Sequence, residues 1–384
     1  MFINFWYVAA ESKEVETGKP HSVQMLGQKF VVFRDSKGQA HCLRNVCAHR
    51  GGSLADGLVV GDCVQCPYHG WQYGGDGSCE HIPTLVKGEK IPARAKVDSY
   101  PVMEKYGLIF AFLGDLPEDE RPPILECDKW QEEGWASTCQ QVVWNLNYQR
   151  SIENGMDCFH NDFVHSQAHV AYSARGARTV EPYAWVETEW RSGLRIDIPS
   201  VAFNPDTGEI TTTEGDLAMV TMGHKGVASF WTYIYPSKEL RQKGMNFRQY
   251  FYETPIDEYS TRLYVLMCRN FMLHDDEKAI AQNAFIISQD LKAIEPVEPK
   301  LPPQRNIREV LLPQDRCIVR YRKLLKQWEA RGWRIDSDTV ENSKGRVAYA
   351  IPCPGRRRSK NWALESVPLV PASQERDQQD VAVA

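Results

Sequence analysis

Cysteine residues gather in one short window of this sequence. Of the eleven cysteines in the chain, five fall within a window of 38 residues: Cys42, Cys47, Cys63, Cys66 and Cys79. Structural disulfides are rare in the reducing compartment that we expect for a chain without secretory features, and eleven is an odd number. We therefore expect this window to carry metal or redox chemistry.

Three metal sites are compatible with parts of the window. A plant-type ferredoxin needs C-x4-C-x2-C, and the third cysteine position is occupied by Arg50, so this site is excluded. A zinc ribbon would use Cys42 and Cys47 with Cys63 and Cys66, and it stays open as an alternative.

The third arrangement also recruits histidines. It consists of a C-x-H motif, 16 further residues and a C-x2-H motif, with the residues Cys47, His49, Cys66 and His69. This is the Rieske spacing, in which two thiolates bind one iron and two neutral imidazoles the other. Such a cluster carries less negative charge than one with four thiolates, so its reduction potential is higher. The sequence therefore favours a Rieske [2Fe–2S] cluster.

A second set of candidate ligands lies in the stretch from Trp144 to His165. Mononuclear iron(II) sites that activate dioxygen use two histidines and one carboxylate. His160 and His165 would point about 140° apart on an ideal helix, so we expect the helix to be distorted or to end between them. His169 follows His165 by four residues, which makes this second pair an alternative.

Alternating strands and two amphipathic helices must position these residues. Residues 28–45 read as a strand, a turn and a strand, which places the first motif in a small all-β setting. Residues 230–236 and 247–270 read as antiparallel strands, and the aromatic residues Trp231 and Tyr233 are candidates to face a substrate cavity. Residues 279–296 and 315–332 have the pattern of amphipathic helices, and acidic residues 275–277 are expected to cap the first of them.

With these motifs the chain resembles the α (terminal oxygenase) subunits of Rieske-type non-haem iron aromatic-ring-hydroxylating oxygenases. The resemblance rests on the sequences WYVA (6–9), CAHRGG (47–52) and CPYHGW (66–71), on the strand-like stretch 99–115 and on a proline-rich connector after it. High-potential Rieske proteins of respiratory complexes carry an extra cysteine in each loop, where this chain has Gly52 and Tyr68. The match is therefore to the oxygenase type.

The resemblance implies an α+β fold in three parts. An N-terminal all-β Rieske domain would comprise residues 1–118. A helix-grip (START-like) catalytic domain with an antiparallel sheet would comprise residues 119–355. Residues 356–384, which are charged and contain prolines, would form a C-terminal tail.

The resemblance also implies roles for particular residues. The family places an aspartate three residues before the first histidine ligand, as Asp157 precedes His160, which favours His160 and His165 as the ligands. It implies Asp290 as the third iron ligand, with Glu295 as the alternative. Asp157 would hydrogen-bond His160 and the cluster ligand His69 of a neighbouring subunit, and Asn154 would lie beside the iron. A carboxylate in this place would fix the tautomer of a metal-bound imidazole.

The implied function is a terminal oxygenase that uses electrons from a redox partner and dioxygen to hydroxylate an organic substrate, aromatic, heterocyclic or polycyclic. Its cofactors would be one [2Fe–2S] cluster and one mononuclear Fe(II) per subunit. The pattern is closest to the α-only monooxygenases and demethylases, so we expect monooxygenation or oxidative demethylation. A cis-dihydroxylating ring dioxygenase and a Rieske electron-transfer protein are the alternatives.

The composition limits the classes of binding partner that we expect for this chain. The 384 residues suggest two domains, and 42% hydrophobic residues, 25% charged residues and a net charge of −5 are ordinary globular values that favour neither nucleic acid nor membrane as a partner. The N-terminus lacks the pattern of a signal peptide, so we expect a cytoplasmic protein. No GxGxxG or P-loop motif is present, so NAD(P)H would act only indirectly, through a ferredoxin and/or a flavin-containing reductase. The family resemblance implies a homotrimer.

Overall fold

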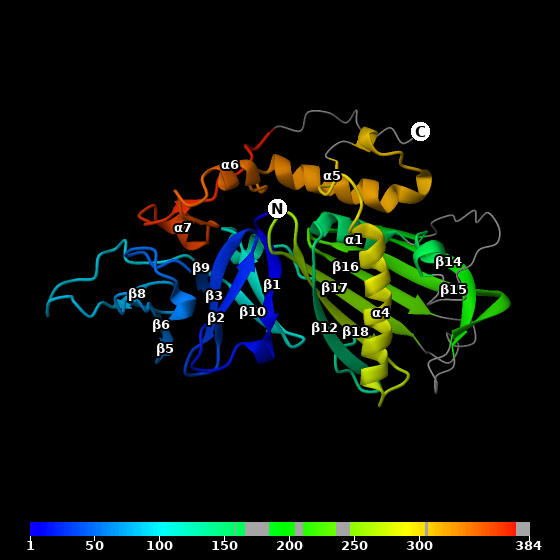
Figure 1. The fold of residues 1–384 in the computed structure, drawn as a ribbon, viewed down its shortest axis with the longest axis horizontal. Coiled ribbons are helices and arrows are strands. Elements are labelled where there is room, and N and C mark those ends of the chain that lie inside the picture. The colour runs from blue at the N-terminus through cyan, green and yellow to red at the C-terminus, as the bar shows by residue number, and fades with distance from the viewer. Residues whose placement is uncertain (158, 166–183, 204–209, 236–245, 304–305, 374–384) are drawn as a thin grey trace. The chain divides into compact units, whose positions relative to one another are not determined.

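The computed structural model describes residues 1–157, 159–165, 184–203, 210–235, 246–303 and 306–373. They form two compact units (Figure 1). The described residues of the first unit are Met1–Pro122, Thr254–Glu258 and 328–373, and the second unit comprises those of Pro123–Glu253 and Tyr259–Gln327. The first boundary therefore lies between residues 122 and 123, close to the expected 118. No helix in the described part of the chain has the length and apolar character needed to cross a bilayer.

The first unit is built from three small sheets. They have the strand orders β1-β11-β10, β2-β3-β4-β9 and β5-β6-β7-β8. Their bounds are β1 Phe5–Glu11, β2 His21–Met25, β3 Gln28–Arg34, β4 Ala40–Arg44, β5 Leu58–Val60, β6 Cys63–Gln65, β7 Gln72–Tyr73, β8 Cys79–His81, β9 Ser99–Tyr100, β10 Val102–Lys105 and β11 Leu108–Leu113. The predicted turn at residues 35–38 joins β3 and β4, which pair antiparallel. A core that includes Val31, Phe33, Leu43 and Val64 packs beneath the two cysteine-containing loops.

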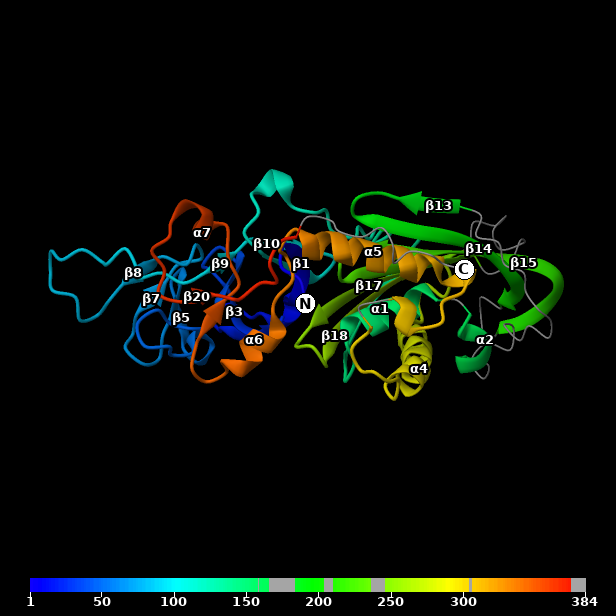
Figure 2. The same cartoon turned by 90° about the horizontal axis from the view of Figure 1, so that it is seen from above.

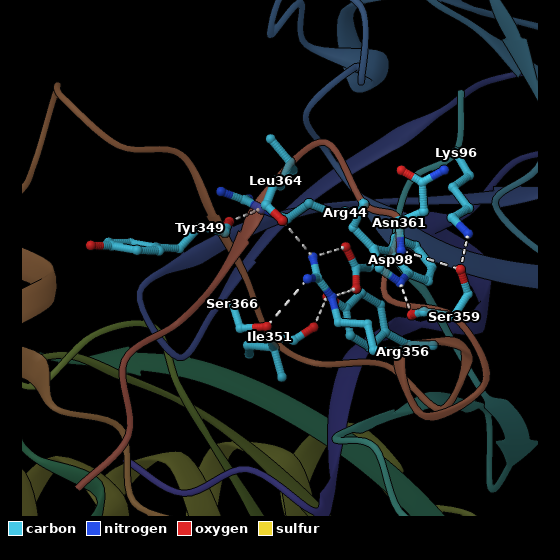
Figure 3. A network of polar contacts seen from close by, with 12 residues as sticks. Arg44, Lys96, Asp98, Tyr349, Ile351, Arg356, Ser359, Asn361, Leu364 and Ser366 are labelled. Carbon is cyan, nitrogen blue, oxygen red and sulfur yellow. Dashed lines mark hydrogen bonds and ion pairs between the residues drawn. The ribbon is translucent and has the colours of Figure 1, made fainter. Parts of the chain in front are cut away.

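The segment expected to be a tail from residue 356 is folded as part of the first unit as far as residue 373, and Figure 3 shows the polar contacts of its first residues. Arg356, in the short helix α7 (Gly355–Arg358), makes two hydrogen bonds to the buried carboxylate of Asp98, of 2.6 and 2.9 Å. Lys96 donates to Ser359 Oγ at 2.8 Å, and Arg44 donates to the carbonyl of Tyr349 at 2.7 Å. The expectation is wrong for these residues because a buried aspartate needs a cationic partner, and Arg356 of this distant segment hydrogen-bonds the carboxylate of Asp98. Residues 374–384 lie outside the described part.

Three further helices and strands belong to this C-terminal segment: α6 (Ser337–Asn342), β19 (Tyr349–Ala350) and β20 (Glu365–Ser366), which pairs parallel with β19. Five short 3-10 turns complete the described elements of the chain: Ser12–Glu14, Leu54–Asp56, Glu118–Glu120, Asn306–Arg308 and Pro313–Asp315.

The second unit is one antiparallel sheet of seven strands with helices on one face (Figures 1 and 2). The strand order is β12-β18-β17-β16-β15-β14-β13. The bounds are β12 Ala136–Trp144, β13 Ala184–Glu187, β14 Arg191–Phe203, β15 Ile210–Lys225, β16 Ser229–Tyr235, β17 Phe247–Pro255 and β18 Thr261–Arg269. The helices are α1 Tyr148–Met156, α2 Asn161–Val164, α4 Asp276–Ile294 and α5 Arg316–Ala330. The N-terminus of α4 is capped by Asp275, which confirms the expected acidic cap.

The helices pack on the face of the sheet that carries Phe230 and Phe251. A Cβ on Gly155 of α1 would lie 2.2 Å from the ring of Phe230, which stacks on Phe251 at 4.1 Å. Ile287 and Leu291 of α4 pack against Phe251 and its neighbours. This helix-on-sheet arrangement is the expected architecture of the second unit.

Trp231 and Tyr233 lie on the opposite face of the sheet, away from α1 and α4. Side chains alternate along a strand, so the neighbour of Phe230 must point the other way. The ring of Trp231 packs against Gly193 and Gly223, and Tyr233 contacts Tyr250 there. The expectation that these two residues face a cavity beside the iron helix is therefore wrong. The alternation in the sequence identifies two faces and does not say which one the helices cover.

Candidate redox and metal centres

The two cysteine-containing loops of the first unit have the same backbone design. In each, the amide of the first residue donates to the carbonyl of the sixth: Cys47 to Gly52 at 2.8 Å and Cys66 to Trp71 at 2.8 Å. The amide of the fifth residue, a glycine with positive φ, donates back to the cysteine carbonyl in both loops. The sequence spacing is therefore the signature of two matching six-residue loops.

The loops bury their cysteines and expose their histidines. Cys47 and Cys66 are 3% and 2% exposed, whereas His49 and His69 are exposed. The two imidazole rings meet edge to face with centroids 4.5 Å apart, and His49 stacks on Trp71 at 4.6 Å. The four predicted residues are thus brought together, with the thiols inside and the imidazoles at the surface of the unit.

The crowding between the loops fits a shared cluster. A Cβ on Gly52 would lie 2.9 Å from Cys66 Sγ, so a side chain at this position would push into the space of the sulfur. The same Cβ would lie 3.4 Å from the Cβ of Tyr68. That is close to the separation of about 3.8 Å between the Cβ atoms of a disulfide, so Gly52 and Tyr68 match the disulfide positions of the high-potential type.

Polar neighbours suit the ligand forms that a cluster needs. Burial is the main cause that raises the pKa of the Cys47 thiol, while the Tyr73 hydroxyl, 3.1 Å from Cys47 Sγ, acts in the opposite direction. Desolvation and the adjacent His69 lower the pKa of His49, which favours the neutral imidazole. Tyr73 can donate to a bound thiolate. The sequence did not predict this contact, because two strands, β5 and β6, separate Tyr73 from Cys47 in the chain.

In the second unit the helix ends just before the two histidines. Asn147 caps α1, which ends at Met156, and Asp157 Oδ1 accepts from the amide of Phe159 at 2.8 Å. The one-turn helix α2 then starts directly after His160 and ends directly before His165. Both histidines therefore lie outside regular helix, and the helix that was expected to be distorted or to end between them already ends before His160.

His160, His165 and Asp290 converge on one point. One ligand atom of each lies within 4.8 Å of the others, and in the described part of the chain no other group of three metal-binding side chains does so. The Nε2 atoms of His160 and His165 are 3.3 and 3.2 Å from the same oxygen of Asp290, Oδ1. This is the donor set of two histidines and one carboxylate that suits iron(II).

The alternatives are separated from this point or lie outside the described residues. Glu295 stands at the C-terminal end of α4, where its carboxylate accepts from Asn145 at 3.3 Å. His169 falls outside the described residues. Among the described candidates, Asp290 is the carboxylate that meets the histidines.

Three polar side chains surround the triad. Asn154 Nδ2 donates to Asp290 Oδ1 at 3.1 Å, and Asp157 Oδ2 lies 3.8 Å from His160 Nδ1. Gln289 Oε1 is 3.0 Å from His165 Nδ1. Asn154 and Asp157 were expected near the iron, whereas no role was predicted for Gln289. Its only signal in the sequence is that it precedes Asp290.

The electrostatics of the triad show what its side chains do without a cation. Burial acts to lower the pKa of His160, but the carboxylates of Asp157 and Asp290 outweigh it and raise the pKa to about 9. Burial acts to raise the pKa of Asp290, but His160 and His165 outweigh it and hold this pKa well below its usual range. The carboxylates of Asp157 and Asp290 therefore favour a positive charge at this point, which a divalent cation can supply.

Helix α1 is anchored by a buried ionic network. Glu153 accepts two hydrogen bonds from Arg322 of α5, at 2.7 and 2.6 Å, and Arg322 also pairs with Glu309 at 2.7 Å. Ser151 hydrogen-bonds the carboxyl of Glu253, whose pKa burial raises to about 8. These contacts hold the helix that presents Asn154 to the triad.

Two family models match most of the chain. Residues 5–101 match the Rieske [2Fe-2S] domain, and residues 144–331 match the vanillate O-demethylase oxygenase C-terminal domain. The first match contains the two loops and the second contains the triad. The expected α+β fold, with a Rieske domain before an oxygenase domain, is confirmed.

Two of the relatives are components of monooxygenases. The chain is 34% identical over 170 residues to the oxygenase component of 3-ketosteroid-9-alpha-monooxygenase of Rhodococcus rhodochrous, a match that covers 43% of each chain. It is 28% identical over 304 residues to TsaM1, the iron-sulfur subunit of the toluene-4-sulfonate monooxygenase system of Comamonas testosteroni, covering 72% of this chain and 81% of that one.

Among solved structures, NdmA of Pseudomonas putida CBB5 with caffeine has a similar fold. It matches with a TM-score of 0.72 and 23% identity over 85% of this chain and 91% of that one. At this identity the likeness concerns the fold. The two family models, together with the loops and the triad that they contain, show that the chain belongs to the Rieske-type non-haem iron oxygenase α subunits.

Proposed function

We propose that this chain is the terminal oxygenase component of a multicomponent monooxygenase. The observation that carries the proposal is that one chain holds both a pair of Cys/His loops and a separate His-His-Asp set with the donor atoms of an iron(II) site. The oxygenase component and the iron-sulfur subunit among the relatives belong to monooxygenases, which favours monooxygenation or oxidative demethylation over cis-dihydroxylation.

The bound cofactors would supply one-electron transfer at a [2Fe–2S] cluster and dioxygen activation at iron(II). Cys47 and Cys66 would hold the buried side of the cluster, and His49 and His69 its exposed side. The exposed imidazoles can be approached by an electron donor, for which a separate ferredoxin or flavin-containing reductase is proposed.

His160, His165 and Asp290 would bind the iron from one side and leave positions open for dioxygen. Asn154 would keep the Asp290 carboxylate in place through its hydrogen bond. Asp157 would orient His160. In a proposed homotrimer it would also accept a hydrogen bond from His69 of a neighbouring copy. The substrate proposed is a small organic molecule.

Metal analysis and oxygen consumption test this proposal. An oxygenase predicts about three irons and two acid-labile sulfides per chain, with one iron lost in the His160→Ala/His165→Ala double variant, whereas an electron carrier predicts two irons in both proteins. A zinc ribbon predicts zinc and no iron–sulfur absorption. The reduced protein would then be tested for oxygen uptake with a 3-ketosteroid, toluene-4-sulfonate and caffeine, which are the compounds named for the relatives.

A further inference from the structure

We propose that Gln289 is a positioning residue for metal binding, because its side-chain carbonyl fixes the orientation and the tautomer of His165. This inference rests on the proposed iron site and adds to it a residue outside the set of ligands. It is drawn from the contacts of one turn of helix α4.

Helix α4 contacts both sides of the same imidazole ring. Asp290 Oδ1 lies 3.2 Å from Nε2 of His165, and Oε1 of the preceding residue, Gln289, lies 3.0 Å from Nδ1. Consecutive residues of a helix point about 100° apart, so neighbouring side chains can reach around one ring. His165 is 2% exposed, which leaves the ring little room to rotate away.

The chemistry of an amide then selects the tautomer. The carbonyl oxygen of Gln289 can only accept a hydrogen bond, so Nδ1 of His165 must carry the proton. In this tautomer the lone pair is on Nε2, and a cation bound between Nε2 and Asp290 Oδ1 would accept it. Ligand histidines in metal sites are commonly held in this way by an acceptor behind the ring.

The two histidines are held unequally. The Nδ1 of His160 is 3.8 Å from Asp157 Oδ2, which is longer than a hydrogen bond, and the side chains of His160 and Asp157 are 16% and 31% exposed. The side chain of His165 is 3% exposed and has its acceptor at 3.0 Å. His165 is therefore the preset ligand, and His160 is the ligand that adjusts when a cation binds.

The experiment measures metal affinity, so that no substrate is needed. Protein with its cluster intact and its mononuclear site emptied is titrated with Co²⁺, followed by calorimetry and by the visible absorption of bound Co²⁺. The variants are Gln289→Leu, which removes the acceptor, and Gln289→Glu, which keeps one. Gln282→Leu, on the exposed surface of the same helix, is the matched control. His160→Ala/His165→Ala defines binding elsewhere on the protein.

We expect Gln289→Leu to bind Co²⁺ about 10- to 100-fold more weakly than the parent, with altered visible bands. Gln289→Glu should bind at least as tightly as the parent, and Gln282→Leu should be unchanged. Circular dichroism and thermal unfolding check the fold, and if Gln289→Leu is unstable, Gln289→Met removes the acceptor while keeping the length of the side chain.

Two failures are distinguishable. If the parent binds Co²⁺ no better than the His160→Ala/His165→Ala variant, the proposed metal site itself is wrong. If the parent binds but Gln289→Leu matches it, or if Gln289→Glu loses as much affinity as Gln289→Leu, Gln289 does not act as an acceptor and the inference is overturned.

Discussion

The contact between the two cysteine-containing loops at Gly52 gives a prediction that separates crowding from backbone strain. In Gly52→Ala the new methyl carbon would lie 2.9 Å from Cys66 Sγ, whereas unstrained heavy-atom contacts begin at about 3.5 Å. The sulfur or the loop must therefore move by about 0.6 Å. Overpacking by one methyl group costs about 1–3 kcal/mol, and the lower entropy of the unfolded alanine chain offsets up to about 1 kcal/mol of this.

Gly51→Ala is the matched control. Gly51 has φ +72°, and a Cβ there would meet nothing within 4 Å, so its cost is the left-handed backbone, about 1–2 kcal/mol. Both variants should therefore lose a similar amount of stability, about 2–8 °C in Tm for a unit of this size. They should differ at the cluster, because only Gly52→Ala displaces a proposed ligand atom.

The assay compares Tm, iron and sulfide content, and the absorption and electron paramagnetic resonance spectra of the cluster in parent and variants. We expect parent-like spectra and iron content for Gly51→Ala, and reduced occupancy with shifted spectra for Gly52→Ala. If Gly52→Ala keeps the parent's occupancy and spectra, the packing of the two loops against Cys66 does not constrain the cluster, and the reasoning is refuted.

Three further predictions concern the second unit. Asp157→Ala should keep both metals bound yet lower product formed per electron by about tenfold or more, and equal yields of product in single-turnover assays would remove Asp157 from the proposed electron route. Glu253 keeps its proton to about pH 8 when folded but loses it near 4.5 when unfolded, so stability should fall as pH rises from about 4.5 to 8. Glu253→Gln should flatten that part of the urea-unfolding profile, and a parallel profile would contradict the burial argument. Glu153→Ala, which leaves Arg322 buried with only Glu309, should lower the free energy of unfolding by about 3 kcal/mol in urea denaturation, while a loss below about 1 kcal/mol would show that Glu309 suffices.

Local spacing was sufficient to predict the first site. Cys47 and His49, and Cys66 and His69, lie within loops of six residues, so the chain brings each pair together without help from distant segments. The two histidines of the second site are also close in sequence. Their spacing excluded one regular helix that carries both, and the structure has only the one-turn helix α2 between them. Asp290 was proposed from the family resemblance, since it lies 130 residues beyond His160 and no local pattern joins them.

Tertiary packing decided the rest. The strand pattern showed that Phe230 and Trp231 point to opposite faces, and only the position of α1 against Phe230 determined which face carries the triad. Arg356 was expected to belong to a C-terminal tail, but it hydrogen-bonds a buried carboxylate 258 residues away in the chain. Gln289 had no signal of its own, because a hydrogen bond to His165 depends on where α4 lies against α2. The sequence by itself determined which atoms could bind metal, since ligand chemistry and short loops are local properties. The fold decided which of these atoms meet and which side chains hold them, because those contacts join segments that are distant in the chain.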